Sequence, residues 1–174
     1  MTTYKSLDKH LEEIQELIDF SNNFNQNSNE RDTVIIGVSY IETLMNQILE
    51  NFFIDGSKTV EKLLKHTGAL GSLNAKVDLA YCSGLIEKTI KTDLGYLAEI
   101  RNQFAHNFKT SFEDERVKKL CDQFKWHEEF FLGRKPPKDA TSFDIFKVEL
   151  NTIISNLQAM KDLAVIEKRK VRNG

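Results

Sequence analysis

The stretch from Asp32 to Phe53 is apolar around more than half of a helical circumference. This feature restricts the folds that the chain can adopt more than any other. One stripe recurs every three or four residues, the period of an α-helix: Val34, Val38, Ile41, Met45, Ile48 and Phe52. A second set widens it, namely Ile35, Ile36, Tyr40, Leu44, Leu49 and Phe53. A helix that is apolar on so many sides needs neighbours on several sides, so we expect it at the centre of a bundle.

A second long helix is predicted near the C-terminus, over about residues 142–171. Its apolar residues are spaced alternately three and four apart: Phe143, Phe146, Leu150, Ile153, Leu157, Met160 and Ala164. This heptad-like seam favours near-antiparallel packing against a neighbouring helix.

Shorter helical patterns fill much of the remaining chain. They cover about residues 7–18, 60–65, 72–84, 87–108 and 117–124. No segment alternates as a strand does, and two prolines and eight glycines in 174 residues are too few for the turns of a β-sandwich. We therefore expect a single all-α domain over residues 1–174, a helical bundle of about six to eight helices, two of them long.

Composition excludes several classes of function. With 24 basic and 26 acidic residues the net charge is −2, which argues against a strongly cationic nucleic-acid binder. Cys82 and Cys121 form neither a disulfide framework nor a metal-binding spacing, and His10, His66 and His127 lie far apart. We expect no metal and no cofactor. Without a signal-peptide core or a membrane-spanning run, we expect a cytoplasmic protein with no membrane contact.

Polar residues interrupt the apolar helix near residue 100, in the sequence Ile-Arg-Asn-Gln-Phe-Ala-His-Asn. Asn102 and His106 share a helix face, and the long side chain of Arg101 can join them. Such a trio can hold a phosphate or polarise a hydroxyl. The alternative is a structural polar cluster of Glu42, Arg101, Asn102 and His106. In it, a partly buried Arg101 would donate two parallel N–H bonds to the carboxylate of Glu42 on the central helix.

The glycine-rich piece TGALGSLNAK is a possible anion-binding site. Ser72 is a plausible N-cap, and Lys76 lies one turn inside the helix that follows. The alternative is an ordinary helix start with an exposed lysine.

A cationic cluster near the C-terminus is the candidate for DNA contact. It consists of Lys168, Arg169, Lys170 and Arg172. The alternative is a solvated helix C-terminus, where cations complement the helix dipole.

The sequence Arg-Asn-x-Phe-Ala-His resembles the Arg-x4-His signature of the HEPN (higher eukaryotes and prokaryotes nucleotide-binding) superfamily of helical bundles. That resemblance implies a metal-independent endoribonuclease as the alternative function. His106 would then transfer a proton at the ribose 2′-hydroxyl, Arg101 would steady the phosphate and Asn102 would orient the site.

A longer resemblance covers about residues 30–125 and is to the mannitol operon repressor family of bacteria. The similar blocks are Arg31-Asp32 with GVSYIETLMNQILENFF, then LGSLNAKVDLAYCSGLI, then DLGYLAEIRNQFAH with SFEDERV and Cys121. Leu73 stands where that family is expected to have an aromatic residue, and Lys76 where an arginine is usual. The resemblance implies an all-helical transcriptional repressor with no catalytic residue. No basic recognition helix is evident, so we expect regulation through a protein partner, or through weak DNA binding.

A homodimer is also expected. Two long apolar helices and the aromatic cluster of Phe124, Trp126, Phe130 and Phe131 exceed what a small bundle can bury.

Overall fold

The computed structural model describes residues 29–54 and 56–171, which form helices α2 to α8 and no strand. The all-α bundle of six to eight helices predicted from the sequence is therefore confirmed, with seven helices in this part of the chain. The helix predicted over residues 7–18 lies outside the described residues. None of the described helices is long and apolar enough to cross a membrane.

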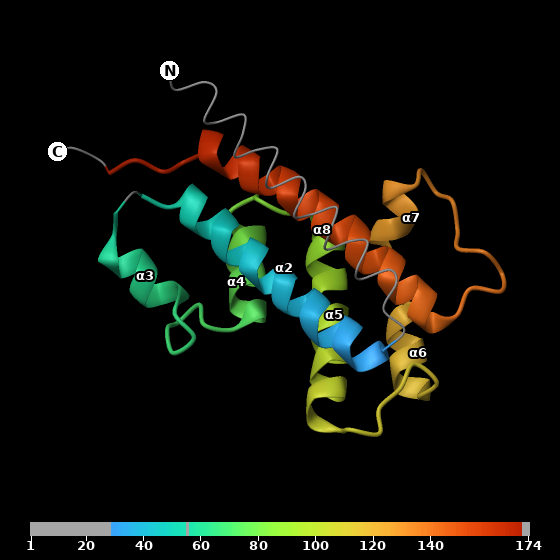
Figure 1. Cartoon of the computed structure of the whole chain (residues 1–174). Coiled ribbons are helices and arrows are strands. Elements are labelled where there is room, and N and C mark those ends of the chain that lie inside the picture. The colour runs from blue at the N-terminus through green and yellow to red at the C-terminus, as the bar shows by residue number, and fades with distance from the viewer. Residues whose placement is uncertain (1–28, 55, 172–174) are drawn as a thin grey trace, which may run out of the picture.

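Helices α2 (Glu30–Phe52) and α8 (Ser142–Ile166) lie side by side and form the long layer of the molecule (Figure 1). Each begins at a side-chain cap: Asn29 accepts a hydrogen bond from the backbone of Asp32, and Thr141 forms a reciprocal capping box with Asp144. The predicted central stripe of α2 is buried throughout, and Ile41, Met45 and Ile48 have no exposed surface. The central position of this helix follows from that burial.

The two long helices run in the same direction, so the expected near-antiparallel packing is wrong for this pair. Tyr40 accepts a hydrogen bond from Gln158, and further along both helices Asn51 donates to the carbonyl of Lys161. An apolar repeat defines which face is buried but carries no direction. Neighbours that run the same way need a long connection, and α3 to α7 provide it.

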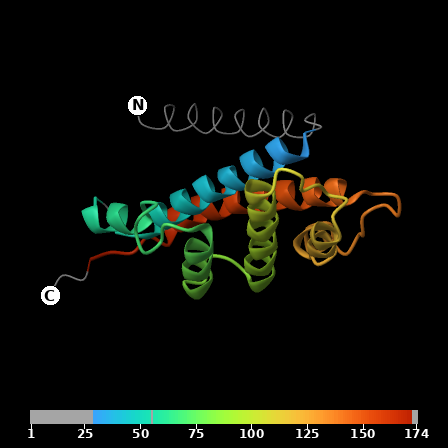
Figure 2. The ribbon, with the colours of Figure 1, turned by 90° about the horizontal axis from the view of Figure 1, so that it is seen from below.

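Helices α4 (Leu73–Cys82) and α5 (Lys88–His106) stand side by side and cross the long layer steeply (Figure 2). The short helix α3 (Lys58–Leu64) lies at one end of the molecule, and α6 (Glu115–Cys121) and α7 (Trp126–Phe130) lie towards the other. This arrangement brings the faces of α2, α4 and α5 together at one junction.

The aromatic cluster that suggested a dimer interface is only partly exposed. Phe124 is 1% exposed and Trp126 packs against the core, whereas Phe130 and Phe131 are 45% and 44% exposed. The small bundle therefore hides more of this surface than expected. The homodimer stays a prediction.

Two glycines give a matched test of the packing around the α3–α4 connection. A Cβ added to buried Gly71 would lie 2.1 Å from the carbonyl oxygen of His66, whereas one added to Gly95 in α5 would meet nothing within 4 Å. We expect Gly71→Ala to destabilise the fold by about 1–3 kcal/mol through overpacking. Gly95→Ala should stabilise it by about 0.5–1 kcal/mol through helix propensity. Urea denaturation measures both changes, and equal effects would contradict this packing.

Candidate functional site

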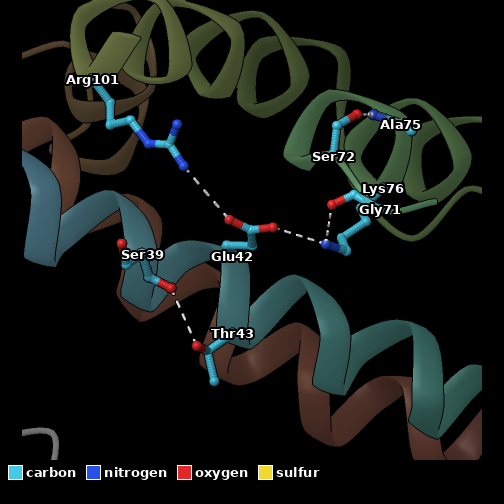
Figure 3. A network of polar contacts seen from close by, with 8 residues as sticks. All are labelled: Ser39, Glu42, Thr43, Gly71, Ser72, Ala75, Lys76 and Arg101. Carbon is cyan, nitrogen blue, oxygen red and sulfur yellow. Dashed lines mark hydrogen bonds and ion pairs between the residues drawn. The ribbon is translucent and has the colours of Figure 1, made fainter. Parts of the chain in front are cut away.

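The carboxylate of Glu42, on α2, is the centre of a polar network that joins three helices (Figure 3). Its Oε1 accepts a hydrogen bond of 2.9 Å from Lys76 Nζ on α4. Its Oε2 lies 3.9 Å from Arg101 Nη2 on α5. The structure thus brings together two sites that the sequence suggested separately, the polar cluster and the Ser72–Lys76 pair.

Lys76 is buried, with 2% of its side chain exposed, although an exposed lysine was the alternative expected at this helix start. Ser72 is the N-cap of α4, as predicted, and accepts a hydrogen bond from the backbone of Ala75. This cap sets the first turn of α4, from which the Lys76 ammonium contacts both Glu42 and, at 3.3 Å, the carbonyl of Gly71. A buried ammonium needs such partners, since an unpaired one would be very costly. An external anion at Ser72 would have to compete with Glu42 for this ammonium.

Arg101 does not make the two parallel hydrogen bonds to Glu42 that we expected. Its side chain is 36% exposed, and the 3.9 Å contact with Glu42 is an ion pair longer than a hydrogen bond. Its Nη1 instead donates a hydrogen bond to Asn102 Oδ1, at 3.1 Å. The physical reason is that Lys76 already occupies Glu42 at close range, so the guanidinium remains at the edge of the network.

A cleft of about 270 Å³ opens beside this network. Its lining residues come from α2, the α3–α4 connection, α4 and α5: Val38, Glu42, His66, Gly71, Ser72, Leu73, Asn74, Ala98, Arg101 and Asn102. The carboxylate of Glu42 lies near two cations, Lys76 and Arg101, so the network has a net charge of +1. The arrangement suits a carboxylate or a phosphate group. His66 also lines the cleft, and no sequence pattern pointed to it, because it lies in the connection before α4.

His106 lies at the end of α5, away from the cleft lining. Arg31, at the start of α2, donates hydrogen bonds to the carbonyls of Phe104 and, at 2.8 Å, Asn107. A cation on the last carbonyls of a helix stabilises its end through the helix dipole. Of the expected trio, Arg101 and Asn102 therefore share the cleft, and His106 is exposed one turn further along.

A second charged cluster, which the sequence analysis missed, lies between α5, α7 and α8. His127 Nδ1 lies 2.6 Å from Glu149 Oε2, and both side chains are almost completely buried. Asp93 Oδ2 accepts hydrogen bonds from the backbone N–H groups of Lys125 and Trp126. Asp93 and Glu149 thus satisfy the first N–H groups of α7, which has no side-chain cap of its own. The three residues are too far apart in the sequence for spacing to reveal them.

Burial and the nearby charge of Glu149 together raise the pKa of Asp93 to about 7, against the lowering effect of the two backbone N–H groups. No group of His, Cys, Asp and Glu in the described part of the chain could hold a metal ion.

The candidate DNA-contact residues lie beyond α8, which ends at Ile166 and not near residue 171. The backbone N–H of Arg169 donates to the carbonyl of Phe52 at 2.8 Å, and its guanidinium lies over the Phe52 ring at 4.9 Å. Lys168 and Lys170 flank it, and Arg172 lies outside the described residues. The segment is therefore attached to the end of α2. It does not continue the helix, so the alternative of a solvated helix C-terminus is wrong for these residues.

The fold and the cleft define an all-helical bundle protein with a charged site at the junction of α2, α4 and α5. The family model described as mannitol repressor matches residues 18–166, so the chain belongs to the mannitol repressor family. This match confirms the family resemblance found in the sequence. No curated protein and no solved structure was found to match the chain.

The raised pKa of Asp93 predicts a pH dependence of stability. The folded state holds this proton up to about pH 7, whereas the unfolded chain releases it near the ordinary value of 3.8. Folding therefore takes up a proton between these values, so the free energy of unfolding should fall as pH rises from about 4 to about 7. Asp93→Asn mimics the protonated acid and should remove this slope.

The measurement is urea denaturation of wild type and Asp93→Asn at pH 5 and pH 8. The variant should gain roughly 1–4 kcal/mol relative to wild type over this interval, since each pKa unit corresponds to ~1.4 kcal/mol. Asp162→Asn, at an exposed position on α8, is the control for loss of one charge. A constant difference between Asp93→Asn and wild type would contradict the raised pKa.

Proposed function

We propose that the protein is a non-enzymatic transcriptional regulator that acts by binding a protein partner, and that an acidic side chain of the partner docks at Arg101. Membership of the mannitol repressor family supports the regulatory role. The cleft supports the mode of action, because its size and charge fit a single side chain better than a duplex.

The observation that carries this proposal is that Lys76 and Arg101 lie at different distances from Glu42. Lys76 meets Glu42 at 2.9 Å, while Arg101 remains at 3.9 Å and one-third exposed. A guanidinium has five N–H donors in a fixed fork, and a carboxylate accepts two of them in parallel. Arg101 therefore retains donors for an external carboxylate without leaving Glu42 alone.

The described cations give less support to direct operator binding. In the helix α6, Arg116 pairs with Glu99 at 2.7 Å and Lys118 with Glu113 at 2.8 Å. The backbone and guanidinium of Arg169 contact Phe52. A groove-reading helix needs cations free to neutralise phosphates, and these are engaged by the protein itself.

Arg101→Ala should abolish regulation while leaving the fold intact, because Lys76 still neutralises Glu42. The measurement is a reporter driven by a mannitol operon promoter in cells that lack the native gene. Complementation with wild type should repress the reporter, and Arg101→Ala should restore most of the expression. Arg116→Ala is the matched control, since it removes an arginine from an exposed ion pair elsewhere.

Three outcomes would speak against the proposal, and two of them would favour an alternative. Repression by Arg101→Ala equal to that of wild type would sink the proposal. Retention of operator DNA that weakens with salt and is lost on truncation after Glu167 would favour direct DNA binding. RNA cleavage lost in His106→Ala would favour the ribonuclease.

A further inference from the structure

A second pocket, of about 470 Å³, lies between α7, the connection over residues 131–141 and the first turns of α8. This volume falls within the ~300–1,000 Å³ of small-molecule sites. Much of its wall is apolar: Phe131, Pro136, Pro137, Ala140, Ile145 and Val148. Such a wall suits the hydrocarbon part of a small organic molecule.

One buried polar group lines this pocket. His127 is 3% exposed and has its Nδ1 bonded to Glu149, but its Nε2 is buried without a hydrogen-bond partner in the described residues. The Glu149 carboxylate also accepts the His127 backbone N–H, so ring and backbone are fixed by one acid. A carboxylate behind Nδ1 holds the imidazole ring in one orientation. The pocket therefore has one oriented, buried polar group in its wall.

The charges at the wall favour an anion. Two cations, Arg134 and Lys135, and two carboxylates, Asp139 and Asp144, also line the pocket. The carboxylate of Asp144 is already engaged by the Thr141 cap and by Lys147, at 3.4 Å. Because Lys147 neutralises Asp144, the remaining charges of the wall are Arg134, Lys135 and Asp139, which sum to one positive charge.

We propose that this pocket binds a small organic acid, with its apolar body against Pro137 and Ile145 and its carboxylate accepting hydrogen bonds from Arg134 and Lys135. The site is separate from the Arg101 cleft and shares no lining residue with it. Its occupancy gives the regulator a place to sense a metabolite.

The probe is 4-phenylbutyrate, and its matched control is 4-phenylbutanol, which has the same apolar body and no charge. In calorimetric titration of the full chain, the acid should bind about tenfold or more tightly than the alcohol, since hydrogen bonds to charged groups are the stronger ones. The His127 ring nitrogens should also shift in ¹⁵N NMR. A background in which the other three histidines are glutamine makes that signal the only one.

Val148→Trp places a large ring in the pocket from a partly exposed position of the wall, and it should weaken the acid at least tenfold. Val165→Trp, on the same helix at another exposed position, should leave binding unchanged. Substitution of His127 itself strands Glu149 and is unsuitable, because loss of binding would then accompany loss of the fold. No binding of the acid at millimolar concentration, equal binding of the alcohol, or equal weakening by both tryptophans would overturn the proposal.

Discussion

Helix α2 buries apolar side chains against α8 on one side and against α4 and α5 on the other. These two contacts determine where α4, α5 and α8 lie in the bundle. The burial of Val34 and Ile41 without exposed surface requires a neighbour on each side. The same contact places Glu42, one position beyond Ile41, at the junction with α4 and α5. A partly buried carboxylate in that place is destabilising unless a cation lies nearby, and Lys76 and Arg101 provide the positive charge.

The two cations near Glu42, Lys76 and Arg101, have different roles. Lys76 is buried and pairs with Glu42 at close range, which links α2 to α4. Arg101 lies further away and remains partly exposed, with Asn102 as its hydrogen-bond partner. The structural alternative and the binding alternative for Arg101 are therefore not exclusive. The network stabilises the junction through Lys76, and Arg101 adds a positive charge at the cleft.

The sequence predicted the helices well because each long helix carries its own periodic signal. It predicted that α2 is central, that Ser72 caps α4 and that Glu42 and Arg101 approach one another. It did not predict the direction of α8 relative to α2, since an apolar stripe is the same read from either end. Nor did it predict that Lys76 is buried, because a lysine after an N-cap is usually solvated.

The cluster of Asp93, His127 and Glu149 shows a second limit of sequence patterns. Each residue stands alone in its own helix, and only the docking of α7 onto α5 and α8 brings the three together. Their role depends on the unsatisfied N–H groups of a five-residue helix, which no spacing rule reveals. Buried polar clusters of this kind follow from tertiary packing and not from local pattern.

Two double-mutant cycles test the central claim that Lys76, and not Arg101, neutralises Glu42. One cycle combines Glu42→Gln with Lys76→Met and the other combines Glu42→Gln with Arg101→Met, each followed by urea denaturation. The account predicts a coupling of about 1–3 kcal/mol for Glu42 with Lys76 and below about 1 kcal/mol for Glu42 with Arg101. A larger coupling with Arg101 would contradict it.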